Sequence, residues 1–389
     1  MEWMFVGLSD VLPRCDEEPK WEVLDKPLEE IASRGHQAIL RPFIFGDYGD
    51  ENYAPSDLLT RKLRHDGKKF KNPRWDDERV QKCVLKFIDA FADEYKDNKQ
   101  VAYIQMGLVG LWGEHHLDKA TYTSKNFPSA AFQKRMIEHY LDGFTIDKEA
   151  GRSSSDLMVS LSFDSAQPHG LFGSTETPSL SDRRFSFFDD TLLVEGHSNR
   201  DNWRQTAQAK GQFNLHVKHG WGGEPTWTGK RKSPCNKDGA WTVPPHDCGN
   251  GEPLSKQAKR LGLNYMVASD AFSTDIPQND LLALARVMGY KFTATAVSRK
   301  GDEKIAVTVK NTGVAYCPYK VSVCSTESIC VGDLSTLAPG DSVVVDVPAS
   351  SSPSQVLSLA SPRLGPNQKI RWSNASADGG AATLTVTVD

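Results

Sequence analysis

Two glutamates stand in similar surroundings, each near the end of an apolar run of the sequence. Glu114 lies in WGEHH and Glu224 in WGGEPTW, and each follows a glycine and has a tryptophan nearby. Hydrolysis of a glycosidic bond generally needs two carboxyl groups, one that donates a proton and one that is ionised. An apolar wall raises the pKa of the first, and hydrogen bonds keep the second ionised. We therefore interpret Glu114 and Glu224 as a catalytic pair; the alternative is that each forms an ion pair with a lysine or arginine where a loop begins.

Further polar and aromatic residues follow other apolar runs. Arg41 ends one such run and could grip a substrate or hold a catalytic glutamate ionised, with a buried ion pair as the alternative. Asp189 and Asp190 could orient a substrate, although one of them could instead cap a turn. The full set of predicted carbohydrate-binding residues is Arg41, Trp112, His115, His116, Asp164, Asp189, Asp190, His219, Trp221, Trp227 and Asp270.

Two histidine pairs raise the question of a metal. His116 follows His115 directly, and His216 and His219 form an H-x-x-H pair. On a strand this second spacing points the rings to opposite faces, because the side-chain period is two. The sequence also contains neither HExxH nor CxxC, spacings that are typical of zinc sites and redox motifs. We therefore predict no metal and no cofactor, and expect His115 or His116 to bond a sugar hydroxyl or an active-site carboxylate.

Alternating strands and helices must hold these residues, up to about residue 288. Apolar runs predict strands at 2–9, 37–45, 101–112, 156–163, 185–193, 211–221 and 263–270, and helical spacing predicts helices at 21–35, 76–96, 130–144, 255–262 and 280–289. This alternation is typical of parallel strands joined by helical crossovers. In barrels of this kind the active site lies at the carboxyl ends of the strands, where the polar residues above occur.

The seven predicted strands are one fewer than a closed (β/α)8 barrel requires. We therefore predict an α/β fold, a TIM-type barrel over residues 1–289 that lacks its first strand in this chain. The N-terminal EWMFVGLS has the pattern of a strand and not of a signal peptide, because no basic segment precedes it, so we expect a truncated start. An open doubly wound sheet is the alternative, but no G-x-G-x-x-G loop follows the first strand.

From Tyr290 onward the pattern changes to alternating apolar positions and frequent turn residues. It predicts an antiparallel β-sandwich over residues 290–389, which we interpret as an accessory domain. Trp372 is its candidate platform for a sugar ring, and Asn374-Ala375-Ser376 forms a glycosylation sequon.

The cysteines and the charge bear on the compartment and the partners. Cys235 and Cys248 bracket a loop, and Cys317, Cys324 and Cys330 cluster, which favours disulfides in a secreted protein over free thiols. The formal net charge of -4 argues against a nucleic-acid partner, which normally selects a basic surface. No apolar stretch approaches the roughly 20 residues of a membrane helix, so we expect no membrane span. Carbohydrate is the predicted ligand.

Several segments resemble a family that is still labelled a domain of unknown function. They are WEVLDKPLEEIASRGHQAILRPF, GLVGLWGEHH, FFDDTLL, GGEP, GYKFTATAV and VTVKNTGVAYCPY, and they span about residues 20–320. The family pairs a glycosidase-like (β/α) barrel with a C-terminal β-sandwich. The arrangement also looks like the large retaining glycosidase clan, in which the acid/base glutamate ends strand four and the nucleophile ends strand seven. The resemblance implies that Glu114 is the acid/base and Glu224 the nucleophile, whereas Gly113 departs from the asparagine that the clan has there.

Three functions follow from these observations. The first is a secreted glycoside hydrolase with a retaining mechanism, acting on a polysaccharide or glycoconjugate. The second is a barrel that binds carbohydrate without cleaving it, which the departure at Gly113 favours. The third is a metal-dependent hydrolase or deacetylase that uses His216 and His219.

Overall fold

The structure is a computed structural model that describes residues 1–46, 52–65, 68–117, 121–144, 157–166, 185–192, 220–225, 258–259, 261–267, 285–326, 329–365, 367–374 and 382–388. The chain divides into two compact units, Met1–Leu215 and His216–Asp389, and each is described by itself. The domain boundary at residues 289 and 290 stays a prediction. Several predicted residues lie outside the described ranges: His216, His219, Trp227, Cys235, Cys248, Asp270, Ala375 and Ser376.

The largest sheet has seven strands in the order β1-β2-β5-β6-β7-β8-β9. They are β1 (Glu2–Gly7), β2 (Ala38–Phe43), β5 (Val101–Gln105), β6 (Met158–Ser162), β7 (Ser186–Leu192), β8 (Trp221–Pro225) and β9 (Tyr265–Met266). The pairings of β1 with β2, β2 with β5, β5 with β6, β6 with β7 and β8 with β9 are parallel. The parallel α/β architecture is thereby confirmed. Within the described ranges no pairing joins β9 to β1, so the closed eight-stranded barrel stays a prediction.

Two of these strands differ from their predicted limits. The predicted strand 101–112 ends at Gln105, and the residues after it form a compact loop instead. The last predicted residue of 211–221 is the first residue of β8, which continues to Pro225. Residues 211–219 lie outside the described ranges, so that part of the predicted strand is not tested. Glu224 consequently lies within a strand and not in the loop after it.

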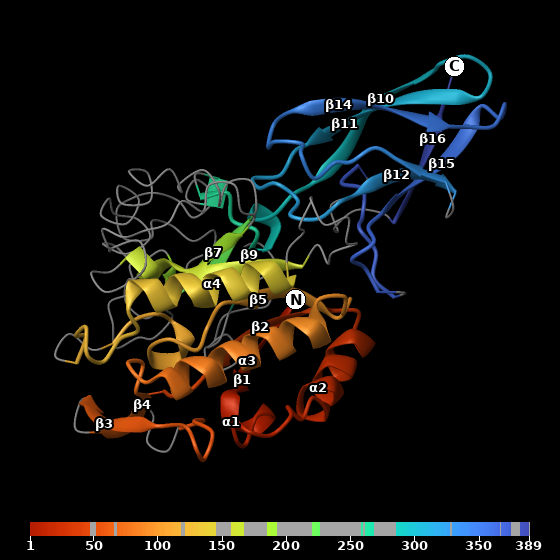
Figure 1. Ribbon diagram of the computed structural model, residues 1–389. Helices are drawn as coiled ribbons and strands as arrows, with labels where there is room; N and C mark the ends of the chain where they lie inside the picture. The colour runs from red at the N-terminus through yellow and green to blue at the C-terminus, as the bar shows by residue number, and fades with distance from the viewer. Residues whose placement is uncertain are drawn as a thin grey trace, which may run out of the picture. The chain divides into compact units, whose positions relative to one another are not determined.

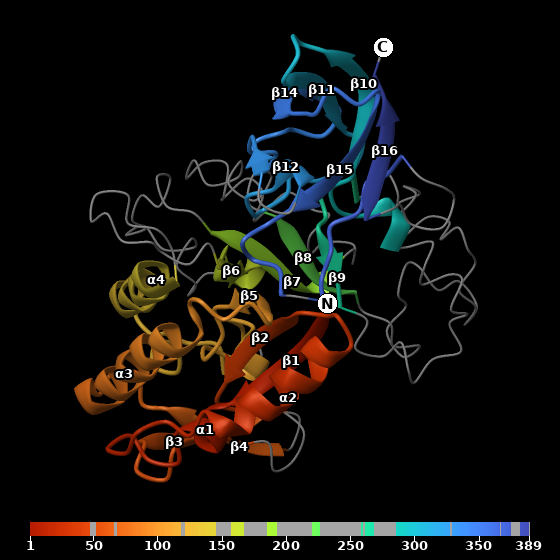
Figure 2. The same cartoon turned by 90° about the vertical axis from the view of Figure 1, so that its right-hand side faces the viewer.

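Helices cover one face of the sheet in the first unit. They are α1 (Leu8–Val11), α2 (Glu22–Ser33), α3 (Glu78–Tyr95) and α4 (Ala130–Phe144), and Figures 1 and 2 show α2, α3 and α4 along the same side of the strands. Asp77 begins α3 as its N-cap, because its side chain accepts a hydrogen bond from the backbone N–H of Arg79. Tyr95 on α3 donates a hydrogen bond to Asp25 on α2 at 2.9 Å, which ties the two helices together.

A two-stranded antiparallel hairpin lies between β2 and α3. It consists of β3 (Thr60–His65) and β4 (Lys68–Pro73), in a region where no strand was predicted. Its sequence, TRKLRH followed by KKFKNP, is mostly basic and contains only Leu63 and Phe70 as large apolar residues. A strand with so little apolar alternation gives no periodic signal in the sequence.

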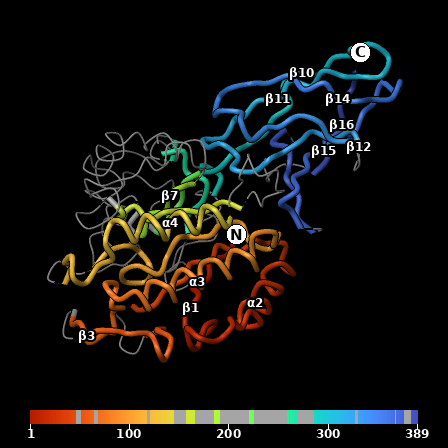
Figure 3. Tube along the Cα trace, in the orientation of Figure 1, coloured from red at the N-terminus to blue at the C-terminus, as the bar shows by residue number. Residues whose placement is uncertain are grey.

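The second unit contains two antiparallel sheets, whose chain path Figure 3 traces. One has the order β10-β11-β14 and the other β13-β12-β15-β16. The strands are β10 (Phe292–Arg299), β11 (Lys304–Asn311), β12 (Ser322–Thr326), β13 (Ile329–Val331), β14 (Ser342–Pro348), β15 (Ser354–Ala360) and β16 (Thr383–Thr387). Val307, Val345, Val323 and Leu357, from both sheets, belong to one buried core. This shared core supports the predicted β-sandwich.

Two features of this unit change sequence-based expectations. Trp372 is completely buried in that core and donates a hydrogen bond from Nε1 to the Leu357 carbonyl at 3.2 Å, so it cannot act as a platform for sugar. Asn374 of the sequon is bonded through its side chain to the backbone of Ala294, donating to the carbonyl at 2.6 Å and accepting from the N–H at 2.8 Å. A glycan on that amide nitrogen would have to break the first of these bonds.

Four cysteines form two disulfides, Cys15–Cys83 and Cys324–Cys330, while Cys317 is a buried free thiol. The disulfides are compatible with an extracellular protein. In the described part of the chain, no helix is long and apolar enough to cross a membrane.

Candidate active site

The loop from Met106 to His116 folds back over the end of β2. Backbone N–H groups of Leu108 and Trp112 donate to the carbonyls of Pro42 and Phe45, each at 2.8 Å. The N–H of Leu111 donates to the His116 carbonyl at 3.0 Å and closes the loop on itself. These bonds bring the GLVGLWGEHH motif to the carboxyl end of β2, so Glu114 reaches the strand end through the loop.

Backbone strain is concentrated in this loop. Leu108, Trp112 and His115 have φ angles of 70°, 49° and 62°, and no other non-glycine residue in the described ranges has a positive φ. Each such conformation costs on the order of 1 kcal/mol or more and persists only where the surroundings enforce it. Strain of this kind is concentrated at functional sites, which makes the loop the first place to look for chemistry.

Arg41 on β2 fixes one oxygen of Glu114. Its side chain is fully buried, and Nη1 donates to Glu114 Oε1 at 2.6 Å while Nε donates to Gln105 Oε1 at 2.6 Å. The guanidinium also lies over the rings of Trp3 and Phe188, at 4.7 and 4.6 Å from their centroids. Arg41 therefore forms the buried ion pair considered from the sequence, and its partner is the predicted catalytic glutamate.

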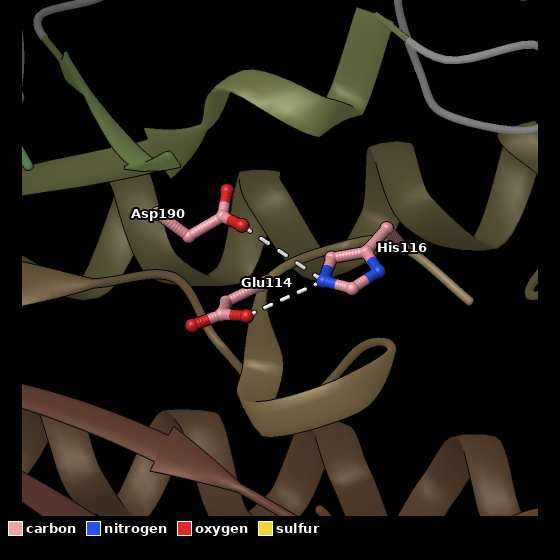
Figure 4. A group of neighbouring side chains, drawn as sticks. All are labelled: Glu114, His116 and Asp190. Atoms are coloured by element: carbon pink, nitrogen blue, oxygen red, sulfur yellow. Dashed lines mark hydrogen bonds and ion pairs between the residues drawn. The ribbon is translucent and has the colours of Figure 1, made fainter. Parts of the chain in front are cut away.

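His116 and Asp190 lie next to the other oxygen of Glu114 (Figure 4). His116 Nε2 is 3.3 Å from Glu114 Oε2 and 3.9 Å from Asp190 Oδ2. Burial lowers the pKa of His116, but its hydrogen bond to Glu114 and the charges of Asp190, Glu114 and Asp164 outweigh burial and raise that pKa to about 9. His116 is therefore an imidazolium at neutral pH, held between two carboxylates.

The three side chains also have the spacing of a cation site. One ligand atom from each of Glu114, His116 and Asp190 lies within 4.8 Å of the others. Two carboxylate oxygens and one imidazole nitrogen are ligands that several divalent metals accept. His216 and His219, the metal ligands considered from the sequence, lie outside the described residues.

His115 points away from this group and supports the loop. It is buried, and its Nε2 lies 2.7 Å from the Met106 carbonyl. Burial lowers the pKa of His115 to about 4, so the ring is neutral at neutral pH and Nε2 is the donor. A direct bond from His115 to a sugar finds no support in this position.

The neighbouring strands supply further polar residues around the loop. Ser162 donates a hydrogen bond to the Glu114 carbonyl at 2.8 Å and accepts one from the Asp164 N–H at 3.2 Å. Asp164 and Asp189 are both buried, and Trp112 is half-buried. Ser162 and Gln105 were not predicted. The signal for each was a polar residue inside an otherwise apolar strand, VAYIQ or MVSLS.

The second glutamate belongs to the second compact unit and is described there. Glu224 is half-buried on β8. Trp221 is fully buried on the same strand, and its N–H donates to Asn264 Oδ1 at 3.3 Å, so it packs in the interior of that unit and offers no open face to a sugar. Gly222 leaves room for the Tyr265 ring, which would come within 2.3 Å of an added Cβ.

Comparisons with known proteins give distant similarity. No family model matches the chain and no curated protein matches its sequence, so the resemblance drawn from GLVGLWGEHH and GGEP stays a prediction. Among solved structures, endo-glycoceramidase II from Rhodococcus sp. is 14% identical with a TM-score of 0.42, over 90% of this chain and 89% of that chain. A family 39 glycoside hydrolase from Bacteroides cellulosilyticus is 11% identical with a TM-score of 0.38, over 90% and 73%. Similarity at this level establishes neither the fold nor the activity of this chain.

Proposed function

We propose that this protein is a secreted glycoside hydrolase in which Glu114 is the acid/base and Glu224 the nucleophile. The observation that carries the proposal is the group of Arg41, Glu114, His116 and Asp190, which is buried or half-buried and is held in place by a strained loop at the carboxyl end of the parallel strands. Building such a group costs conformational strain and desolvation, which structure alone does not require.

The geometry assigns different tasks to the two oxygens of Glu114. Oε1 accepts from Arg41 at 2.6 Å, so the carboxylate is oriented by a donor that stays charged at all working pH values. Oε2 faces His116 and is the oxygen that would exchange a proton with a glycosidic oxygen. Retention further requires Glu224 to come within about 5–5.5 Å of Glu114, where it attacks the anomeric carbon and forms a covalent glycosyl intermediate.

Carbohydrate is the proposed ligand, and aryl glycosides with different sugars are a direct test. The wild-type protein should release the aryl group from at least one of them. Glu114→Gln and Glu224→Gln should each lower kcat by at least about 100-fold, as expected for loss of a general acid or a nucleophile. Glu22→Gln, at an exposed position on α2, is the matched control and should keep full activity.

Chemical rescue separates the two roles. Added azide should restore turnover in a variant that lacks the nucleophile and yield a glycosyl azide of inverted configuration relative to the substrate. In a variant that lacks the acid/base, azide should instead yield the azide of retained configuration. The reverse assignment of products would exchange the roles of the two glutamates.

A second function is favoured by one observation at the same site. Both oxygens of Glu114 have basic side chains beside them, Arg41 at 2.6 Å and His116 at 3.3 Å, and a carboxylate engaged in this way could serve only to shape a binding site. A non-catalytic carbohydrate-binding protein would bind a glycan on an array without cleaving it. Its affinity for that glycan would be the same in wild type and Glu224→Gln.

A further inference from the structure

His116 stands between two carboxylates that different parts of the first unit supply (Figure 4). Glu114 belongs to the same loop and Asp190 to β7, and the side chains of His116, Glu114 and Asp190 are 27%, 9% and 11% exposed. Asp164, after β6, acts on His116 electrostatically as a third negative group. The contact of His116 with Glu114 is the shorter of the two carboxylate contacts, so the Nε2 proton points first to Oε2.

Charge balance indicates what this position requires. Glu114, Asp190 and Asp164 bring three negative charges when ionised, and Arg41 offsets one of them. Neighbouring His115 is neutral at neutral pH and offsets none. A proton on His116 supplies one further positive charge at the centre of the group. Because the guanidinium of Arg41 is already bonded to Glu114, a single proton fits this position better than a divalent metal, which it would repel.

We propose that His116 and Glu114 share one proton across the Nε2···Oε2 contact, and that this proton is the one given to the leaving group in the proposed hydrolase. The inference rests on the proposed function and deepens it. Asp190 acts on His116 and is a positioning residue, because it holds the imidazole charged and aimed at Glu114.

Each step of the reaction conserves atoms and charge. In the resting state the proton is on Nε2 and Glu114 is ionised. As the glycosidic C–O bond breaks, the bonding electrons go to the glycosidic oxygen, which takes a proton from Oε2 while Nε2 passes its proton to Oε2. Glu224 forms the new bond to the anomeric carbon. In the second half, Glu114 removes a proton from water, the water oxygen displaces Glu224, and the proton returns to His116.

The state of the imidazole can be measured without any activity. We expect the ¹⁵N side-chain NMR signals of His116, assigned from their loss in His116→Gln, to show a charged ring at pH 7 that deprotonates near pH 9. Glu114→Gln should lower that pKa by about 1–3 units, because it removes the nearest negative charge. His139, which lies 2.6 Å from Asp89 on the helical face, serves as an internal reference that neither change should move. A neutral His116 ring at pH 7 would refute the shared proton.

Kinetics then test delivery of the proton. His116→Gln should lower kcat by about 10–100-fold on substrates whose leaving group needs a proton, with little change in KM. The same variant should keep near wild-type kcat on a dinitrophenyl glycoside, whose leaving group departs without protonation. It should also move the basic limb of the pH profile to lower pH. Equal losses on both substrates, with an unmoved limb, would mean that His116 only holds the loop in shape.

The two levels of the proposal fail separately. A charged His116 in a protein that cleaves no glycoside would leave the shared proton standing but refute its delivery, together with the proposed function. The NMR samples are treated with EDTA and then titrated with Zn²⁺. Loss of the charged-ring signal at one equivalent of zinc would show a metal centre and overturn the proposal, whereas an unchanged signal supports it.

Discussion

Arg41 is completely buried and charged, and it is bonded to Glu114 and Gln105 and covered by two aromatic rings. Burial of a charge is tolerated only when it is paired and hydrogen-bonded. Replacing Arg41 by Met leaves Glu114 in a nearly dry position without its partner. We expect the free energy of unfolding to fall by about 3–5 kcal/mol, measured by urea denaturation.

The control for this prediction is an exposed arginine in a similar pair. Arg34 bonds Glu2 on the surface, with side chains 50% and 33% exposed, so Arg34→Met should cost no more than about 1 kcal/mol. The double variant Arg41→Met/Glu114→Gln should be more stable than Arg41→Met alone, because no uncompensated charge remains. Equal stability losses for Arg41→Met and Arg34→Met would contradict the burial argument.

His115 makes stability depend on pH. Burial lowers its pKa in the folded state to about 4, against 6.5 for an ordinary histidine. Between these values the unfolded chain binds a proton that the folded protein does not, so the free energy of unfolding falls as pH falls from 6.5 towards 4. The full effect is about 3 kcal/mol at most, and it should be missing in His115→Gln.

Other groups titrate outside that window. Hydrogen bonds from Arg34 and Arg79 lower the pKa of Glu2 and Asp77 to about 2, so stability from these carboxylates is lost only as pH falls below about 4.5. His116 behaves in the opposite way. Its folded-state pKa is raised to about 9, so its contribution is full below 6.5 and is lost as pH rises towards 9. Curves for wild type and His115→Gln that coincide between pH 4.5 and 6.5 would exclude the predicted effect.

Among the elements, the loop after β5 departs most from its predicted structure. The apolar run VAYIQMGLVGLW predicts one strand, but β5 ends at Gln105. Gly107 shows why: an added Cβ would lie 1.9 Å from the Pro42 carbonyl oxygen, so the chain turns where only glycine fits. Hydrophobic periodicity reports burial and not backbone turns, so the strands 38–43 and 158–162 were predictable and the course of this loop was not.

The same distinction applies to the candidate site. Arg41, Glu114, His116 and Asp190 were predicted individually because polar residues followed apolar runs, and the structure brings these four together. Their pairing could not be predicted, because it depends on the left-handed turns at Leu108, Trp112 and His115, for which non-glycine residues give no sequence signal.

Gly107→Ala tests the importance of that turn. The methyl group must displace the Pro42 carbonyl or the loop, so we expect a loss of about 1–3 kcal/mol in unfolding free energy and a displaced Glu114. Gly301→Ala is the contrasting variant. Gly301 has a φ of 71° but nothing within 4 Å of an added Cβ, so only conformational strain, about 1 kcal/mol, opposes alanine there.

Activity distinguishes the two glycine variants more sharply than stability does. Gly107→Ala should lower glycosidase activity on the aryl glycosides by more than about 10-fold at a temperature where the variant is fully folded, since a displacement of about 1 Å can cost two orders of magnitude. Gly301→Ala should retain wild-type activity. Full activity in Gly107→Ala would show that the close packing of loop and strand is not needed to position Glu114.

At the scale of the whole molecule, each compact unit has its own disulfide. Cys15–Cys83 closes a loop of 68 residues within Met1–Leu215, and Cys324–Cys330 closes one of 6 residues within His216–Asp389. A cross-link stabilises mainly by restricting the unfolded chain, and its effect grows with the logarithm of loop length. The chain-entropy relation gives about 4 kcal/mol for the long loop and about 2 kcal/mol for the short one.

Removing each disulfide by paired Cys→Ser changes should therefore affect the two units unequally. Hydrogen exchange followed by mass spectrometry measures the opening free energy of each unit in the same sample. The variant without Cys15–Cys83 should lose more protection in α3 and β5 than the variant without Cys324–Cys330 loses in β12 and β15. If each unit folds on its own, protection in the unit that keeps its disulfide stays unchanged. Loss of protection in both units from either variant would show instead that the chain unfolds as one cooperative body.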